Sequence, residues 1–163
     1  MKETSFNFST LARVLVAIMA LASQPFMLGQ SNYLSVDPPQ KVTAKRGGPA
    51  ETKLALHVQN GYHVNSNTPA EDYLIPLRLR WEPGPLTSVE VVFPKPELQK
   101  YQFSEKPLSV FTGDFQIVAR FKADPNAPAG PGVLLGKLRY QACSHDTCYR
   151  PATVEIRLPF NVQ

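Results

Sequence analysis

The residues best suited to chemistry are two cysteines, Cys143 and Cys148, with four residues between them. Those four residues, Ser-His-Asp-Thr, carry polar side chains that can bond their own backbone and favour a tight turn. The flanking segments 133–140 and 153–158 interleave apolar and polar residues, which indicates β-strands. In such a hairpin the cysteines would face each other with Cβ atoms about 4.5–5.5 Å apart, close to disulfide geometry. We therefore expect a Cys143–Cys148 bond wherever the compartment oxidises thiols.

Such a pair of cysteines has three conceivable roles. As a structural staple it would close a loop of about six residues, which stabilises a fold by roughly 2 kcal/mol, against nearly 5 for a loop of about 100. As a redox pair it would exchange with other thiols, and His145 and Arg150 would favour a thiolate whereas Asp146 would oppose it. As a metal site it would use Cys143, His145 and Cys148 as ligands. The residues alone leave all three roles open.

The amino-terminal segment has the pattern of a secretory signal. Lys2 and Arg13 flank a polar stretch, and the apolar run 14–22 ends in Ala-Leu-Ala, which predicts cleavage after Ala22. The run is shorter than the roughly 20 apolar residues of a transmembrane helix. An uncleaved anchor extending through 25–28 is the alternative. We expect a periplasmic or secreted protein without membrane insertion of the mature chain, in a compartment where disulfides persist.

The rest of the chain has the punctuation of an all-β domain. Prolines make up 16 of the 163 residues, about twice the usual frequency near 5%, and separate short apolar segments. Asn60-Gly61 is the preferred signal of a two-residue hairpin turn. Strands are predicted over 52–58, 74–81, 89–93 and 115–121, followed by the cysteine hairpin, and the segment 62–69 is expected to begin as a strand and end as a loop. The pattern predicts an immunoglobulin-like β-sandwich.

Length and charge bound the organisation further. We assign residues 1–22 to the signal peptide, 23–40 to a flexible lead-in with a first edge strand, and 41–163 to one folded domain. The formal net charge is only +4, and the basic residues are spread along the predicted strands, so no nucleic-acid partner is expected. A mature chain of roughly 140 residues can bury a core without staples, which lowers the need for a structural disulfide.

One segment lacks a clean period. Residues 94–111 form a long connection that contains Tyr101 and Phe103. Long connections in compact domains are usually lids or binding loops, and both aromatic rings would be costly to expose. The alternative is that they simply pack against the end of the sandwich.

The ending Tyr140-Gln141-Ala142-Cys143, short gap, Cys148-Tyr149-x-Pro151 resembles the N-terminal periplasmic domain of the thiol:disulfide interchange protein DsbD family. Gly61-Tyr62-His63-Val64 is similar to a strand of that family, and the aromatic connection before the hairpin also matches. The likeness covers residues 40–160. Two features depart from the pattern: the gap holds four residues rather than five, and His63 or Asn65 occupies a position that is often tyrosine.

The resemblance implies a specific activity. The family domain is an immunoglobulin-like sandwich that receives electrons from a thioredoxin-like domain and passes them to periplasmic oxidoreductases, as one component of a protein-disulfide reductase system. Cys148 would be the cysteine that partners engage and Cys143 the resolving thiol. A cap loop, with Phe103 at its tip by position, would shield the pair together with Tyr101.

Other residues near the pair are assigned by the same likeness or, for His145, by its place in the cysteine turn, where it could stabilise the leaving thiolate. His63, Asn65, His145 and Tyr149 are candidates to line the site, although His145 also fits a solvated turn, and His57 and His63 fit strand surface positions better than metal ligands. No cofactor and no metal is expected. Because no thioredoxin-like domain follows the sandwich, we expect a stand-alone domain whose electron donor is a separate protein. The competing interpretation is a non-catalytic binding module with a structural disulfide, and a Cys/His metal carrier is a further alternative.

Overall fold

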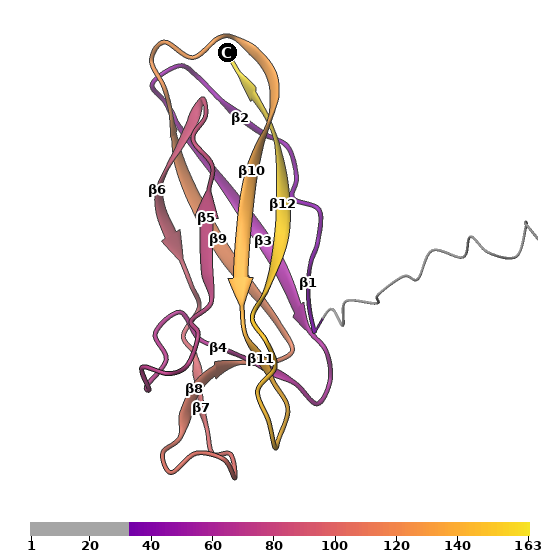
Figure 1. The fold of residues 1–163 in the computed structure, drawn as a ribbon. Helices are drawn as coiled ribbons and strands as arrows, with labels where there is room; N and C mark the ends of the chain where they lie inside the picture. The colour runs from indigo at the N-terminus through magenta and orange to yellow at the C-terminus, as the bar shows by residue number, and fades with distance from the viewer. Residues whose placement is uncertain (1–32) are drawn as a thin grey trace, which may run out of the picture. The chain divides into compact units, whose positions relative to one another are not determined.

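The computed structural model describes residues 33–163, which contain twelve β-strands (Figure 1). The signal peptide expected over 1–22 lies outside the described residues. The strands are β1 (Leu34–Val36), β2 (Val42–Ala44), β3 (Pro49–Val58), β4 (His63–Asn65), β5 (Arg78–Trp81), β6 (Leu86–Val92), β7 (Glu97–Gln99), β8 (Leu108–Phe111), β9 (Asp114–Ala123), β10 (Gly130–Tyr140), β11 (Ala142–Cys143) and β12 (Ala152–Val162).

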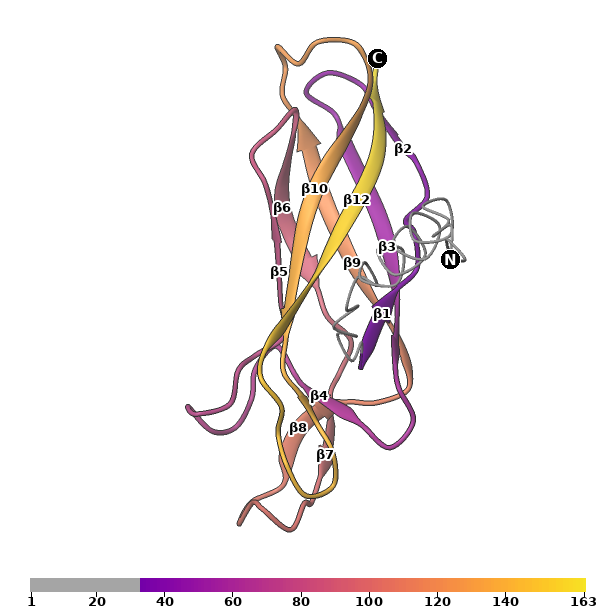
Figure 2. The ribbon, with the colours of Figure 1, turned by 45° about the vertical axis from the view of Figure 1, so that its right-hand side comes forward.

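Two four-stranded sheets form the sandwich. One has the order β1-β3-β9-β6 and the other β2-β12-β10-β5, and Figures 1 and 2 show them as two layers. All pairings are antiparallel except the parallel pairing of β2 with β12. The predicted all-β, immunoglobulin-like sandwich is confirmed.

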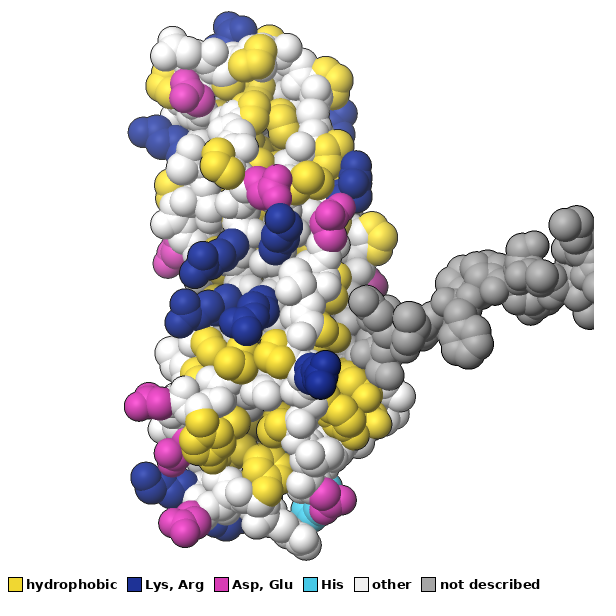
Figure 3. Space-filling view, viewed as in Figure 1, with side chains coloured by type: hydrophobic (Ala, Val, Ile, Leu, Met, Phe, Trp, Pro, Cys, Tyr) yellow, Lys and Arg dark blue, Asp and Glu magenta, His cyan; other side chains and the backbone are white. Residues whose placement is uncertain are grey.

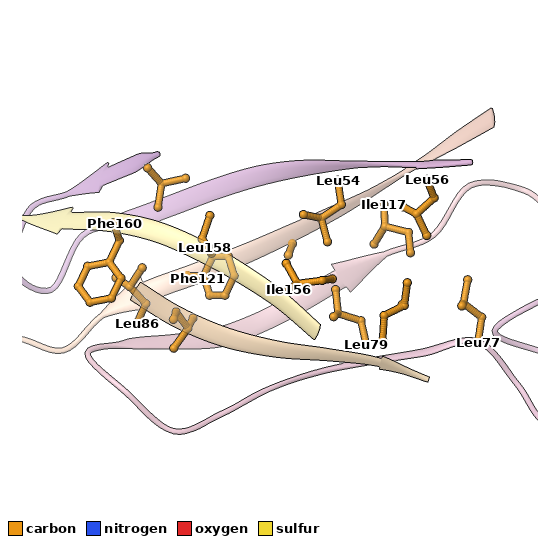
Figure 4. Close-up of a cluster of buried hydrophobic side chains, with 14 of the residues drawn as sticks. Leu54, Leu56, Leu77, Leu79, Leu86, Ile117, Phe121, Ile156, Leu158 and Phe160 are labelled. Atoms are coloured by element: carbon orange, nitrogen blue, oxygen red, sulfur yellow. The ribbon is translucent and has the colours of Figure 1, made fainter. Parts of the chain in front are cut away.

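Period-two alternation places the core between these sheets. Leu54, Ile117 and Phe121 of one sheet and Ile156 and Leu158 of the other are almost fully buried, and their side chains fill the space between the layers (Figure 4). Burying one such side chain contributes about 1.5–3 kcal/mol. A single core leucine therefore stabilises the fold about as much as closing the short cysteine loop, so this domain does not depend on a disulfide for its core.

A third four-stranded sheet, β11-β4-β8-β7, lies at one end of the sandwich (Figure 1). Two of its strands come from the segment 94–111, which the sequence predicted to be one long connection. The structure shows instead a β7–β8 hairpin with three paired positions and a tip at 100–107, called the cap loop below. The strands were missed because three or four residues are too short to establish a period.

The hairpin predicted at Asn60-Gly61 is wrong. The turn itself exists, since Gly61 has φ +83° and the Tyr62 amide donates to the Gln59 carbonyl at 3.0 Å. However, β3 pairs with β1 and β9, whereas β4 pairs with β8 and β11. All three residues of β4 are buried, so this strand lies inside the third sheet rather than at the half-exposed edge that a simple hairpin would give. The turn carries the chain from the sandwich into the sheet that holds the cysteines.

Basic residues gather on the exposed face of the β5–β10 pair. The sequence had suggested that they are spread along the strands. Arg78 lies opposite Arg139 and Arg80 opposite Lys137, and all four are exposed. Figure 3 shows Lys and Arg side chains gathered across this face.

The described part of the chain has no helix with the length and apolar character needed to cross a bilayer.

Candidate functional site: a disulfide hairpin beside an aromatic cap

The Cys143–Cys148 disulfide is formed, with a sulfur–sulfur distance of 2.07 Å. The two cysteines form an antiparallel bridge just beyond the long β10–β12 ladder. The turn between them is closed by the Ser144 amide, which donates to the Thr147 carbonyl at 2.8 Å, and the Tyr149 amide donates to the Ala142 carbonyl at 2.9 Å. Both bonds continue the hairpin pairing, so the disulfide is presented on a regular extension of the sandwich.

The two cysteines differ in exposure. Cys143 is 0% exposed, whereas Cys148 is only partly buried. Cys143 lies in the two-residue strand β11, which pairs with β4 on its other side. A molecule approaching from solvent therefore has better access to the Cys148 side of the bond than to the Cys143 side.

Gln141, two residues before the first cysteine, links three segments of the site. Its side-chain oxygen accepts from the Asn65 side-chain amide and from the Ile75 backbone amide, both at 3.1 Å. Its side-chain amide donates to the Tyr149 carbonyl at 3.1 Å. The buried Asn65 also donates to the Ile75 carbonyl at 3.1 Å. Gln141 thus ties β4, the loop before β5 and the returning strand of the cysteine hairpin to one another.

An aromatic cluster supports the Cys148 side of the hairpin. The Tyr149 ring stacks on Tyr33 with a centroid distance of 4.6 Å, and Tyr62 lies 4.5 Å from Tyr33 and 5.9 Å from Tyr149. All three rings are partly buried. The cluster fixes the residue that follows Cys148 against both the first strand and the turn before β4.

His63 occupies the position opposite Cys143. The two residues are paired in the antiparallel β4–β11 register, which places their side chains on the same face of the sheet. The sequence favoured a surface position for His63, but the residue is only 2% exposed, because β4 is covered on both sides. Burial lowers the pKa of His63 to about 4, so its imidazole is neutral at pH 7.

The cap loop covers His63. The Tyr101 ring stacks on the imidazole with a centroid distance of 4.0 Å and an interplanar angle of 24°. Phe103 lies 5.6 Å from Tyr101 and 6.4 Å from His63. Tyr101 is 8% exposed, whereas Phe103 is only partly buried. Tyr101 therefore makes the inner contact, and Phe103 lies outside it.

The cap loop keeps its own shape mainly through local bonds. The Tyr101 hydroxyl donates to the Gln99 side-chain oxygen at 2.6 Å. The Lys100 ammonium donates to the carbonyls of Ser104 and Glu105. Burial, and then the nearby Glu97 carboxylate, raise the pKa of Tyr101 to about 12, which keeps its phenol protonated.

A groove of about 400 Å³ lies on the cap, lined by residues 100–105 and His145. His145 is exposed in the cysteine turn, and its ring meets Tyr101 edge-on at 6.4 Å. The cap and the cysteine turn are therefore neighbours in space although they are far apart in sequence. Within residues 33–163, no group of three or more His, Cys, Asp or Glu side chains is placed to hold a metal ion.

The structure brings the predicted site residues to this one end of the molecule. Tyr101, Phe103, His63 and His145 form one side, Tyr149 belongs to the aromatic cluster on the other, and Asn65 lies within the Gln141 network. Sequence reasoning gave no role to Gln141, Tyr33 or Tyr62. Gln141 and Tyr62 stood inside the quoted motifs, but their partners are set by tertiary contacts.

The fold and the site together describe a small β-sandwich domain with one disulfide. An aromatic cap loop lies on one side of that disulfide, and the Gln141 hydrogen bonds and the tyrosine cluster hold the other side. The chain belongs to the family described as thiol:disulfide interchange protein DsbD, N-terminal, whose model matches residues 30–159. No curated protein sequence matches the chain.

Solved structures with a similar fold are distant in sequence. The N-terminal periplasmic domain of ScsB from Proteus mirabilis matches with a TM-score of 0.51 and 12% identity over 72% of this chain. The chain spans only 43% of that structure's length. The reduced N-terminal domain of Neisseria meningitidis DsbD has a TM-score of 0.44 and 19% identity, over 68% of this chain and 77% of that one.

Proposed function

We propose that this domain performs thiol:disulfide exchange through Cys143 and Cys148 outside the cytoplasm, in the periplasm. It would relay reducing equivalents from a thioredoxin-like donor to extracytoplasmic oxidoreductases. The observation that carries the proposal is the placement of the disulfide. It lies beyond the core, with one cysteine fully buried and the other partly accessible, in a chain of the DsbD N-terminal family.

The exchange would proceed in two displacements. A donor thiolate attacks the Cys148 sulfur, the disulfide breaks, and its electron pair leaves with Cys143 as a thiolate. The donor's second thiolate then attacks the donor sulfur of the mixed disulfide and releases Cys148. The donor becomes a disulfide, and this domain becomes a dithiol that has gained two electrons and two protons.

Delivery to an acceptor would reverse the roles. The Cys148 thiolate attacks the acceptor disulfide, and Cys143 resolves the resulting mixed disulfide by attacking Cys148. The unequal exposure of the cysteines supports this assignment, since the more accessible sulfur meets the partner and the buried one acts within the protein.

The cap loop would provide selectivity. Tyr101 and Phe103 lie beside the site and would hinder small thiols, whereas a docking protein can supply contacts that replace those of the cap. No cofactor is required, because all the electrons move between sulfur atoms.

The deciding experiment is the reduction potential of the Cys143–Cys148 pair, measured by equilibrating the mature domain with glutathione. We expect a value between about −120 and −270 mV, the range of exchange-active proteins. A value below about −300 mV would mark a structural disulfide and favour a non-catalytic binding module instead.

A further inference from the structure

Exchange at Cys148 creates an electrostatic problem at Cys143. Cys143 would leave as a thiolate, yet it is 0% exposed, and burial in apolar surroundings disfavours a thiolate. A buried leaving group of this kind needs a hydrogen-bond donor or a positive charge close by. The following inference rests on the proposed function and concerns which residue meets that need.

The ionisable groups around Cys143 narrow the choice. In the cap loop, Tyr101 is a neutral phenol and the Lys100 ammonium is bonded to the carbonyls of Ser104 and Glu105. In and after the turn, His145, Asp146 and Arg150 are all exposed to solvent. Glu97 of β7 lies near Tyr101 and carries the wrong sign to help. On β4, His63 is both buried and paired directly with Cys143.

His63 also has an unused polar atom. Its Nε2 is buried and has no hydrogen-bond partner among the described residues. An unpaired buried polar atom costs free energy, so it calls for an explanation. The face of the ring is covered by Tyr101 at 4.0 Å, and the residue opposite in the strand register is the cysteine that would become charged.

We propose that His63 stabilises the Cys143 thiolate during exchange, and that Tyr101 controls when it can do so. With the cap in place the imidazole is stacked on Tyr101 and shielded from solvent. Once a partner displaces Tyr101, the imidazole gains the freedom to turn an N–H toward the Cys143 sulfur. The electron pair of the broken S–S bond stays on that sulfur, and His63 undergoes no redox change.

The protonation state of His63 supports this order of events. Burial holds its pKa well below the usual value, so the capped imidazole carries no charge that would activate the disulfide prematurely. Loss of the cap hydrates the ring, and a neighbouring thiolate further favours the imidazolium, so both changes raise its pKa.

The test isolates Cys143 as the only thiol in a Cys148→Ser, Tyr101→Ala background, in which the ring that stacks on His63 is gone, and follows the ionisation of Cys143 by thiolate absorbance against pH. His63→Phe keeps a ring but removes both nitrogens, and should lower the thiolate fraction at pH 7 about tenfold, equal to one pKa unit. His57→Phe is the matched control, because His57 is an exposed histidine in the sandwich, and should change nothing. An equal effect of His145→Phe with none from His63→Phe would overturn the proposal.

A second measurement needs no substitution at His63. Imidazole nitrogen resonances can be titrated by NMR in the oxidised and reduced wild-type domain. We expect the His63 pKa to be higher in the reduced protein, and to rise in oxidised Tyr101→Ala. Identical His63 titrations in all three samples would refute the proposal.

These outcomes separate the two proposals. A reduction potential below about −300 mV would defeat the exchange function whatever His63 does. An exchange-range potential with a Cys143 pKa that ignores His63 would defeat only this inference.

Discussion

The two supports of the disulfide are built differently. On one side, β10 and β12 pair continuously from Gly130↔Val162 to Tyr140↔Ala152 and contribute to the main core. On the other, β7 and β8 share three paired positions, and the cap residue Tyr101 packs in a separate small cluster with Leu74, Leu108 and Val110. Moving the cap would therefore disturb the small cluster and leave the main core intact.

The hydrogen bonds follow the same division. Gln141 joins residues separated by up to 76 positions in sequence, whereas the cap bonds of Tyr101, Lys100 and Ser104 span at most five. Among residues 33–163 the cap has one ion pair to another segment, between Lys106 and Glu71 at 3.4 Å, and exposed pairs of this kind contribute about 0–1 kcal/mol. Segments with few long-range contacts open at low cost. The comparison shows a disulfide hairpin held by long-range hydrogen bonds beside a cap loop held mainly by local ones.

The largest effect is expected from the cysteines themselves. Cys148→Ser should abolish exchange, because the accessible sulfur is lost. Cys143→Ser should also abolish turnover but leave Cys148 able to form a mixed disulfide that this domain cannot resolve. A thioredoxin-like partner that keeps only one cysteine, activated as a mixed disulfide with thionitrobenzoate, should trap this species, because Cys148 displaces thionitrobenzoate and no second partner thiol can release Cys148. A non-reducing gel measures the trapped species. Equal trapping by both variants would contradict the assigned roles.

Among the single substitutions outside the cysteines, we expect the largest change in stability from the loss of the Gln141 hydrogen bonds. Gln141→Ala removes three hydrogen bonds and takes this partner from the side-chain amide of buried Asn65 and the backbone amide of partly buried Ile75, so we expect a loss of about 3 kcal/mol in the free energy of unfolding. Gln116→Ala, at an exposed position of β9, is the matched control. Denaturant unfolding measures both, and equal losses would show that Gln141 has no special role.

The same contrast explains what the sequence could predict. The sandwich strands β3, β9, β10 and β12 are ten or eleven residues long, so their alternation is visible locally and implies the fold. The strands of the third sheet have two to four residues, which is too short for a period, and their partners are chosen by tertiary packing.

The site was predictable to a similar degree. The cysteine spacing and turn residues predict the hairpin and its bond, and the long connection 94–111, which has no clean period, pointed to Tyr101 and Phe103. The burial of His63 and the three bonds of Gln141 could not be predicted, because each depends on a segment far away in sequence.

The buried His63 should lower the stability of the domain in acid. The pKa of His63 is lowered to about 4 in the folded protein, so between about pH 6.5 and 4 the unfolded chain binds a proton that the folded chain does not. Stability is therefore lost as pH falls through this window, by roughly 2–3 kcal/mol from this residue. His63→Phe should flatten this part of the pH profile in urea unfolding, and an unchanged slope would contradict it.

Removing an aromatic ring from the cap loop should change the rate of disulfide reduction more than the stability of the fold. Tyr101→Ala removes the ring that stacks on His63, and reduction of the disulfide by dithiothreitol should speed up about tenfold, as when a barrier falls by 1.4 kcal/mol. Phe103→Ala should have a smaller effect, because Phe103 lies outside Tyr101. Stopped-flow reduction kinetics test both, and a faster rate in Phe103→Ala than in Tyr101→Ala would reverse the order of the two rings.

The smallest expected effect is the contribution of His57, an exposed histidine of the sandwich, to the pH dependence of stability. His57 lies 2.9 Å from Asp114 and 3.2 Å from Asp37, and these carboxylates raise its pKa above the usual 6.5. A raised pKa contributes stability that is present below pH 6.5 and is lost as pH rises through the folded value, opposite in sign to His63. His57→Gln should remove this slight decline near neutral pH, and the decline should also weaken in high salt because the pair is exposed. Thermal melting between pH 5 and 8 at low and high salt would test this, and a variant that melts with the wild-type pH dependence would show that the two aspartates do not hold the proton.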